Sequence, residues 1–317
     1  MKKKINIIIS TVITIILLYF LLSQIKINDV IQIFQNSNFY YLALGFFFYI
    51  LMGIVRTFRF KLLLKNKLSF FDILPITYVH SLLNSILPVR TGEFSYVYML
   101  KKNNKQSVSR GLSSLIIARV FDFIILISIM ILFVVISKDL PNKEIFDGLI
   151  PYLVMLLVLI ILGLFSLIFL HDFSLNIAKK ITKFLPLIFA DPLHKFIKSF
   201  KMYKSVSTLL ITLVYALLIY FCGMIANYYF VIAIGYYLPL NILIIASTFS
   251  ILSTVLPING LGSFGTMEGV WVLILGYFAY SVNDSVLLSL SLHIILLLSS
   301  SVLGLVSWIK LKQKEIK

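Results

Sequence analysis

The chain has 317 residues, of which 60% are hydrophobic and 13% are charged, and its mean hydropathy is +1.03. Soluble domains are about half apolar and about a quarter charged, so this composition excludes a soluble enzyme, a nucleic-acid-binding domain and a disordered chain. The net charge of +16 indicates basic residues on the cytoplasmic loops of a membrane protein rather than contact with nucleic acid. We expect an all-α polytopic protein that forms a single integral membrane domain over residues 1–317.

Six segments are long and apolar enough to cross a bilayer, since a spanning helix needs roughly 17–25 mainly apolar residues. They are 5–22, 39–55, 111–136, 149–170, 208–234 and 284–309. The first follows three lysines, but no small-residue cleavage site comes after it. We therefore interpret it as a retained span rather than a signal peptide.

Two further apolar stretches, 72–100 and 241–280, are interrupted and predict re-entrant helical hairpins. Proline lacks the amide hydrogen that a helix needs, so Pro88 and Pro257 would each end a half-helix before the chain reverses. The predicted turn residues are Pro88 and Gly92 in the first stretch, and Pro257, Gly260, Gly262 and Gly265 in the second.

Lysine and arginine are concentrated at the N-terminus and in the stretches 56–67, 101–110, 179–204 and 310–317. The positive-inside rule assigns these stretches, and both termini, to the cytoplasmic side of the cytoplasmic membrane. The first hairpin would then enter from the cytoplasm and the second from outside.

The two interrupted stretches align without gaps at an offset of 169 residues, where 81–89 (SLLNSILPV) pairs with 250–258 (SILSTVLPI). Apolar runs resemble one another easily, so the topology carries more weight than the match. Each half has three spans and one hairpin, and an odd number of spans inverts the second half. We expect an inverted repeat of 1–140 and 141–317, with about eight membrane helices and a site near the midplane.

Ionisable residues inside apolar segments cost roughly 2.5–3.5 kcal/mol each on insertion scales, and function is the default hypothesis for them. Arg119 and Asp122 are three apart and can pair on one helix face, either to fix packing or to present the arginine to a phosphate. Arg90 and Glu93 lie at the tip of the first hairpin, where an anchor and a helix-dipole role are alternatives. Glu268 has no lysine or arginine within 40 positions and is a candidate for the central site.

Together these five predicted binding residues carry one net negative charge. That balance suggests a bound cation, a protonated carboxyl or a zwitterionic or aminoacylated phospholipid headgroup. The G-x-G-x-x-G pattern at 260–265 is no dinucleotide site, because no strand–turn–helix unit surrounds it. We expect no cofactor and no metal.

The loop 173–204 predicts two amphipathic interfacial helices with lysines beside their apolar stripes. Such helices lie on an anionic membrane surface, and simple anchoring is the alternative to a functional role.

Three motifs carry a family resemblance. Leu87-Pro88-Val89-Arg90-Thr91-Gly92-Glu93 resembles the LP-x-R-x-GE signature of the lysylphosphatidylglycerol synthase transmembrane-region family, also called flippase-like. Residues 118–122 resemble its basic–x–x–Asp span, and 262–268 resemble its GG-x-G-x-x-E turn, with Ser263 in place of one glycine. The motifs occur in the expected order, so the resemblance covers nearly the whole chain.

The resemblance implies a polytopic inner-membrane protein that acts on lipids. In the best-understood members this domain flips an aminoacylated phospholipid made by an attached soluble transferase. Other members accompany glycosyltransferases that use polyprenyl-phosphate carriers. The chain ends at Lys317, shortly after its last predicted span, so we expect no lysyltransferase domain.

The sequence therefore predicts translocation of a phospholipid or polyprenyl-phosphate lipid. Arg119 and Arg90 would bind phosphate, while Glu93 and Glu268 would face a cationic group or take a proton. A separate transferase or glycosyltransferase is a candidate partner. The alternative is a membrane subunit or an enzyme of lipid or polyprenyl-phosphate-linked glycan synthesis.

Overall fold

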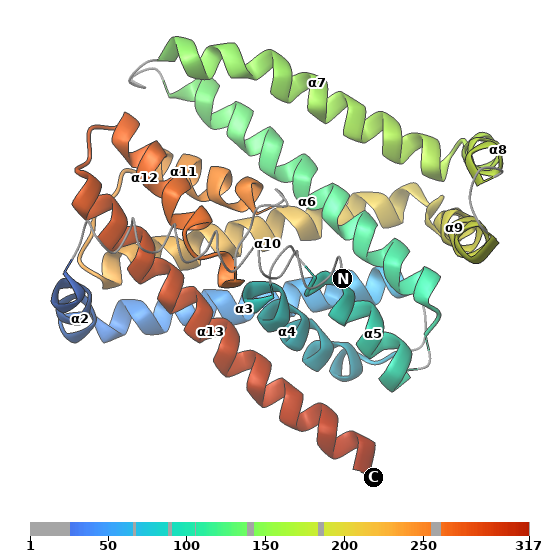
Figure 1. Ribbon diagram of the computed structural model, residues 1–317, viewed down its shortest axis with the longest axis horizontal. Coiled ribbons are helices and arrows are strands. Elements are labelled where there is room, and N and C mark those ends of the chain that lie inside the picture. Colours follow the sequence, from blue (N-terminus) through green and yellow to red (C-terminus); the bar gives the residue numbers. More distant parts are fainter. Residues whose placement is uncertain are drawn as a thin grey trace.

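The computed structural model describes residues 26–65, 68–87, 91–104, 106–137, 143–182, 187–254 and 261–316. In these ranges every regular element is a helix, which confirms the all-α expectation. The elements, in chain order, are α2 (Ile27–Gln35), α3 (Phe39–Leu64), α4 (Phe70–Ile86), α5 (Glu93–Asn104), α6 (Val108–Ile136), α7 (Lys143–Ile168), α8 (His171–Thr182), α9 (Leu187–Ser199), η2 (Phe200–Tyr203), α10 (Val206–Ala233), α11 (Leu240–Ser253), η3 (Leu261–Ser263), α12 (Thr266–Tyr277) and α13 (Val282–Ile316) (Figure 1).

Within the described residues, five helices are long and apolar enough to cross a membrane. They are α3, α6, α7, α10 and most of α13, and they coincide with five of the six predicted spans. The sixth predicted span, 5–22, lies outside the described residues.

Polar residues fix where the long helices begin. The side chain of Asn38 accepts hydrogen bonds from the first amides of α3, and Ser107 and Ser205 do the same for α6 and α10. Such caps satisfy amides that have no partner inside the helix. At α4, Ser69 and Asp72 form a reciprocal capping box.

The most extensive helix–helix contact joins α3 and α10, which run side by side (Figure 1). They are antiparallel, because the amide of Asn38 before α3 donates to the carbonyl of Ala233 at the end of α10. Gly45 permits this approach: a Cβ there would lie 2.5 Å from the ring of Phe230. Around this pair, α13 packs along α4, and α7 lies at the outer edge against α6 (Figure 1).

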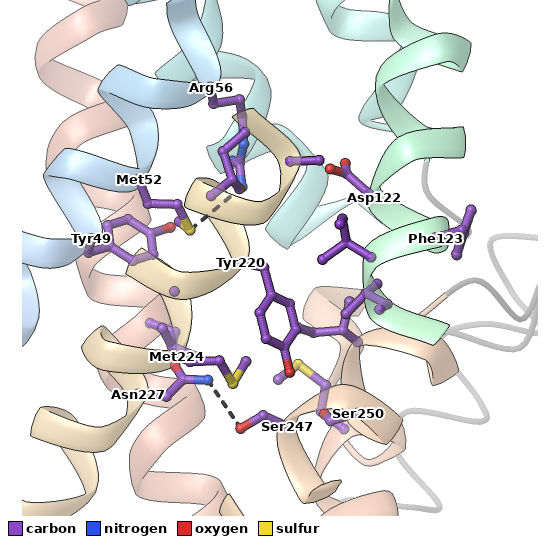
Figure 2. A pocket seen from close by; sticks show the side chains of 18 of the residues that line it. Tyr49, Met52, Arg56, Asp122, Phe123, Tyr220, Met224, Asn227, Ser247 and Ser250 are labelled. Carbon is purple, nitrogen blue, oxygen red and sulfur yellow. Dashed lines mark hydrogen bonds between the residues drawn. The ribbon is translucent and has the colours of Figure 1, made fainter. Parts of the chain in front are cut away.

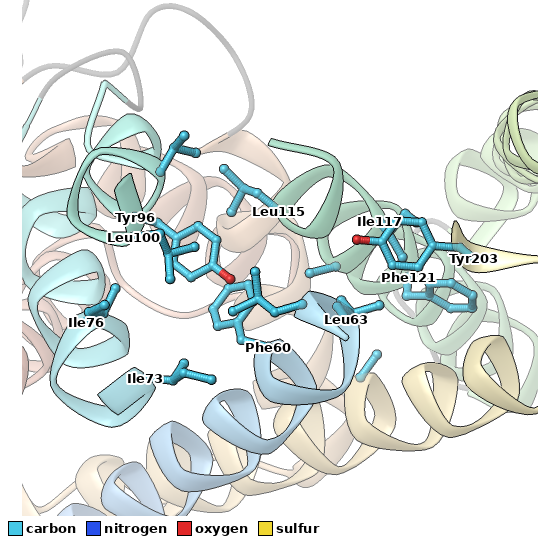
Figure 3. Close-up of a cluster of buried hydrophobic side chains, with 14 of the residues drawn as sticks. Phe60, Leu63, Ile73, Ile76, Tyr96, Leu100, Leu115, Ile117, Phe121 and Tyr203 are labelled. Atoms are coloured by element: carbon cyan, nitrogen blue, oxygen red, sulfur yellow. The ribbon is translucent and has the colours of Figure 1, made fainter. Parts of the chain in front are cut away.

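A buried aromatic and aliphatic cluster joins α3, α4, α5, α6 and η2 (Figure 3). Phe60 stacks on Tyr96 at a ring-centroid distance of 4.3 Å, and the hydroxyl of Tyr96 lies 3.3 Å from that of Ser114. These contacts hold the short helix α5 against α6. The cluster therefore places the start of α5 beside the polar residues of α6.

Both interrupted stretches are broken helices, as predicted. In the first, α4 ends at Ile86 and α5 begins at Glu93; in the second, α11 ends at Ser253 and α12 begins at Thr266. Both first helices end before the prolines. Pro88, Pro257 and Gly260 themselves lie outside the described residues.

In the described part of the second break, three residues have left-handed backbone. Gly262 has a φ of 64°, Ser263 of 59° and Gly265 of 84°. Glycine adopts this conformation without a steric penalty, which accounts for two of the predicted turn residues. Ser263 stands where the family pattern has glycine, and it keeps the conformation that a glycine would favour.

The loop before α10 forms two helices, but their boundary differs from the expected one. The sequence predicts one apolar stripe from Phe173 to Ile188 and another after Pro192, whereas α8 ends at Thr182 and α9 runs from Leu187 through Pro192 to Ser199. The end of the second predicted stripe does not lie at an interface, because Phe200 and Tyr203 are fully buried in the protein core. Phe173 and Ile177 of α8 remain exposed.

We expect Gly92→Ala to lower the free energy of unfolding by about 1–3 kcal/mol, the usual cost of overpacking. A Cβ at Gly92 would lie 2.4 Å from Asn84 Cα and from the Leu83 carbonyl oxygen, and backbone cannot move aside easily. The measurement is thermal unfolding in detergent. Gly148→Ala on α7 is the control, because no atom lies within 4 Å of its Cβ position. Equal melting temperatures for the two variants would contradict the expected close packing at Gly92.

Candidate functional site

A chain of ion pairs links α5 and α6. Nη2 of Arg119 lies 2.7 Å from Oε1 of Glu93, and Nη1 of Arg119 lies 3.3 Å from Oδ2 of Asp122. The pairing predicted from the three-residue spacing of Arg119 and Asp122 is confirmed. The structure also brings Glu93 to the same arginine, so three of the five predicted binding residues meet.

Arg59 of α3 continues this chain. Its two terminal nitrogens bond both carboxylate oxygens of Asp122, with Nη2 donating to Oδ2 at 3.2 Å. The guanidinium fork matches the carboxylate, and such paired bonds are strong and directional. Only 1% of the Arg59 side chain is exposed, so it is a structural part of the cluster.

The role of Arg59 was not predicted, because Arg56 and Arg59 follow the predicted span 39–55 and were assigned to a cytoplasmic stretch. In the structure α3 continues without a break to Leu64. Their spacing could have revealed both residues. They are three apart, and no proline or glycine lies between Arg56 and Leu64 to end the helix. A helix that continues through both residues puts them on one face.

Arg56 differs from its two arginine neighbours, because no described carboxylate lies within ion-pairing distance of it. Its Nη1 donates to Ser81 Oγ at 2.8 Å, and its Nη2 lies 3.8 Å from Met52 Sδ (Figure 2). Its Nε is buried and has no hydrogen-bond partner in the described part of the chain. Arg56 therefore retains both charge and donor capacity.

Arg56 and Asp122 line one end of a cavity of about 230 Å³ (Figure 2). Arg119, which pairs with Asp122, lines the same cavity. The remaining wall comes from α3, α6, α10, α11, α12 and α13 and is largely aromatic and aliphatic. Polar groups occur along it, including Ser247, which accepts from Asn227 at 3.3 Å. The cavity thus joins a charged end to an apolar wall, as a lipid with a charged headgroup requires.

The described cluster contains three arginines and two carboxylates, and so carries one net positive charge. This differs from the net negative charge of the five predicted residues, because Arg56 and Arg59 belong to the cluster and Glu268 lies elsewhere. The predicted Arg90 lies outside the described residues. A net positive site surrounded by apolar helices favours an anionic ligand.

The structure does not join Glu268 to the arginines. It is fully buried; its Oε2 accepts from the Gly265 amide at 2.7 Å, and its Oε1 lies 2.6 Å from Nδ1 of His293. These bonds hold the second helix break together, so Glu268 has a clear role in the turn. Across the described ranges, no group of three histidine, cysteine or acidic residues could hold a metal ion.

A family model for the lysylphosphatidylglycerol synthase TM region matches residues 7–304. The chain belongs to this family. It is also similar to UPF0104 membrane protein MJ1078 of Methanocaldococcus jannaschii, with 27% identity over 100 residues, which are 31% of this chain and 42% of that protein. The match thus spans less than half of the relative's length.

No solved structure matches the chain. Family membership and the long apolar helices together establish a multi-pass membrane protein.

We expect Arg59→Met to destabilise the protein by about 1.5–3 kcal/mol, the contribution of hydrogen bonds to a charged group, because Asp122 would lose both bonds to Arg59 and keep only its 3.3 Å contact with Arg119. The double variant Arg59→Met with Asp122→Leu should recover most of that loss, since apolar side chains of similar volume often replace a buried pair without cost. Unfolding in detergent measures both. Lys61→Met, on the same helix but exposed, is the control. The expectation fails if the single variant is as stable as the parent.

Proposed function

We propose that this protein moves a phosphate-bearing lipid between the leaflets of the cytoplasmic membrane. The observation that carries the proposal is Arg56, a cation that lines a largely apolar cavity and has no acidic partner among the described residues. An uncompensated charge at membrane depth is costly, so such residues usually serve a ligand or a pathway. A lipid phosphate would supply the missing anion.

Two guanidinium groups suit a phosphodiester. Arg56 and Arg119 line the same end of the cavity, and planar guanidinium donors match the tetrahedral oxygens of phosphate better than a lysine ammonium does. The single negative charge of a phosphodiester would balance the net positive charge of the cluster. The acyl or prenyl chains would follow the apolar wall of the cavity.

An inverted repeat would let this site open to either side. The order long helix, broken pair, long helix occurs in α3–α6 and again in α10–α13. Ser81, which binds Arg56, aligns with Ser250, and Ser250 lines the same cavity. These features support repeats of 1–140 and 141–317 with one re-entrant hairpin each. Alternating access would then come from rocking one repeat against the other.

The orientation with both termini in the cytoplasm also remains a proposal. The excess of basic residues on that side persists when Arg56 and Arg59 are taken out of it. The exposed apolar residues of α8 and its neighbouring lysines favour contact with an anionic membrane surface. A separate transferase or glycosyltransferase would supply the lipid, in keeping with the lipid chemistry in the family's name.

We expect Arg56→Gln to slow lipid movement in proteoliposomes roughly ten- to hundredfold, because a hydrogen bond to a charged group contributes about 1.5–3 kcal/mol. The assay follows two labelled phosphodiesters, phosphatidylglycerol and a glucosyl phosphoprenol, from one leaflet to the other. Lys61→Gln removes an exposed charge from the same helix and should leave the rate unchanged.

Two results would overturn the proposal. One is a parent protein that moves neither lipid. The other is Arg56→Gln moving lipid at the parent rate. Copurification of a lipid-synthesising enzyme with a parent that moves nothing would favour the alternative function, a membrane subunit of that synthesis.

A further inference from the structure

A second cavity of about 210 Å³ lies between the two helix breaks. Asn84, Ser85 and Leu87 come from the end of α4, and Thr254, Gly262 and Ser263 come from the second break. Tyr49, Met267 and Leu296 line both this cavity and the one that contains the arginines. The two spaces therefore adjoin, and a molecule bound to Arg56 could extend into the second.

The described walls of the second cavity are partly polar and carry no formal charge from lysine, arginine or an acid. Their polar groups are amide, hydroxyl and imidazole groups, from Tyr49, Asn84, Ser85, Thr254, Ser263 and His293. Oδ1 of Asn84 is shielded from solvent and has no hydrogen-bond partner in the part of the chain that the structure describes. A buried acceptor in this state favours a ligand that donates a hydrogen bond.

No carboxylate is left for a cationic headgroup. Among the described residues that line either cavity, the only acid is Asp122, and both its oxygens are bonded to arginine. Glu93 is paired with Arg119, and Glu268 is fully buried against His293. The stretches 88–90 and 255–260 contain one charged residue in their sequence, and it is an arginine.

We infer that the transported lipid carries an uncharged, hydroxyl-bearing alcohol, such as glycerol or a sugar, on its phosphate. The inference rests on the proposed function. The two arginines hold the phosphate, and the second cavity receives the alcohol, whose hydroxyls donate to Asn84 and exchange bonds with the serine and threonine hydroxyls. An aminoacylated headgroup would bring ammonium groups next to Arg56 and Arg119 and find no acid to receive them.

The first test compares three labelled lipids in proteoliposomes: phosphatidylglycerol, a glucosyl phosphoprenol and lysyl-phosphatidylglycerol. We expect one or both of the first two to move at least about tenfold faster than the third, because like charges placed together are strongly disfavoured. Lysyl-phosphatidylglycerol moving as fast as the others would overturn the inference and leave the proposed function standing. If none of the three moves, the proposed function itself fails.

Soluble glycerol phosphate has the proposed headgroup but no lipid chains. Added as a competitor, it tests whether the protein recognises the headgroup itself. The arrangement predicts that millimolar glycerol phosphate slows movement of the favoured lipid, whereas lysine does not. Inhibition by lysine but not by glycerol phosphate would contradict an uncharged headgroup.

The second test places a carboxylate in the cavity. Asn84→Asp should raise the rate of lysyl-phosphatidylglycerol relative to phosphatidylglycerol about tenfold, because it supplies the missing acid. Asn283→Asp adds the same charge at an exposed position and should leave the ratio unchanged. If Asn84→Asp does not elute as a folded protein, Ser85→Asp supplies the charge from the adjacent position. An unchanged ratio in a folded variant of the cavity would overturn the assignment.

Discussion

Asp122 shares its carboxylate between two arginines, and much of the arrangement around the cavity depends on this sharing. Asp122 lies on α6 together with Arg119 and binds Arg59 of α3, so one acid ties two long helices together. Arg119 then reaches Glu93 on α5, which the aromatic cluster around Phe60 and Tyr96 holds in place. Buried ions need partners of opposite charge, and here every carboxylate of the cluster is occupied. The consequence is that Arg56, the remaining cation, faces the cavity without an acid.

The two helix breaks satisfy their backbone groups in different ways. A helix that ends inside an apolar environment leaves amides and carbonyls without partners, and each is costly. At the second break the Glu268 carboxylate accepts from the Gly265 amide and is held by His293. At the first break the carbonyl of Gly92 accepts from Ser95 Oγ at 2.5 Å and lies 3.3 Å from Nδ1 of His80. An acid at the second break therefore stabilises the turn, whereas Glu93, the acid at the first, is joined to Arg119, which lines the cavity. Similar sequence patterns in the two halves thus lead to different roles for their glutamates.

Hydropathy and proline positions were sufficient to predict the helical class, five long apolar helices and both broken helices, because these depend on local sequence. The Arg119–Asp122 pair could also be predicted, since three-residue spacing fixes a helix face. The roles of Arg59 and Glu268 could not, because each depends on a partner far along the chain: Asp122 is 63 positions from Arg59, and His293 is 25 from Glu268. A basic residue after an apolar run has the same local signature whether it anchors a loop or pairs inside a bundle. The predicted span 5–22 and the predicted residues Arg90, Pro88, Pro257 and Gly260 lie outside the described residues and stay predictions.

The charge balance also bears on how such a carrier would work. With its cavity empty, the described cluster has one net positive charge, and a bound phosphodiester with an uncharged alcohol would bring it to zero. Moving a neutral assembly through a low-dielectric region costs less than moving a charged one, because desolvation of an uncompensated ion is the dominant penalty. On the proposed function, the loaded protein would therefore change its access more readily than the empty one. A lipid with a cationic headgroup would leave the loaded site with a net positive charge, and the cost of changing access would rise again. The same electrostatics would then favour an anionic lipid both in binding and in the step that carries it across.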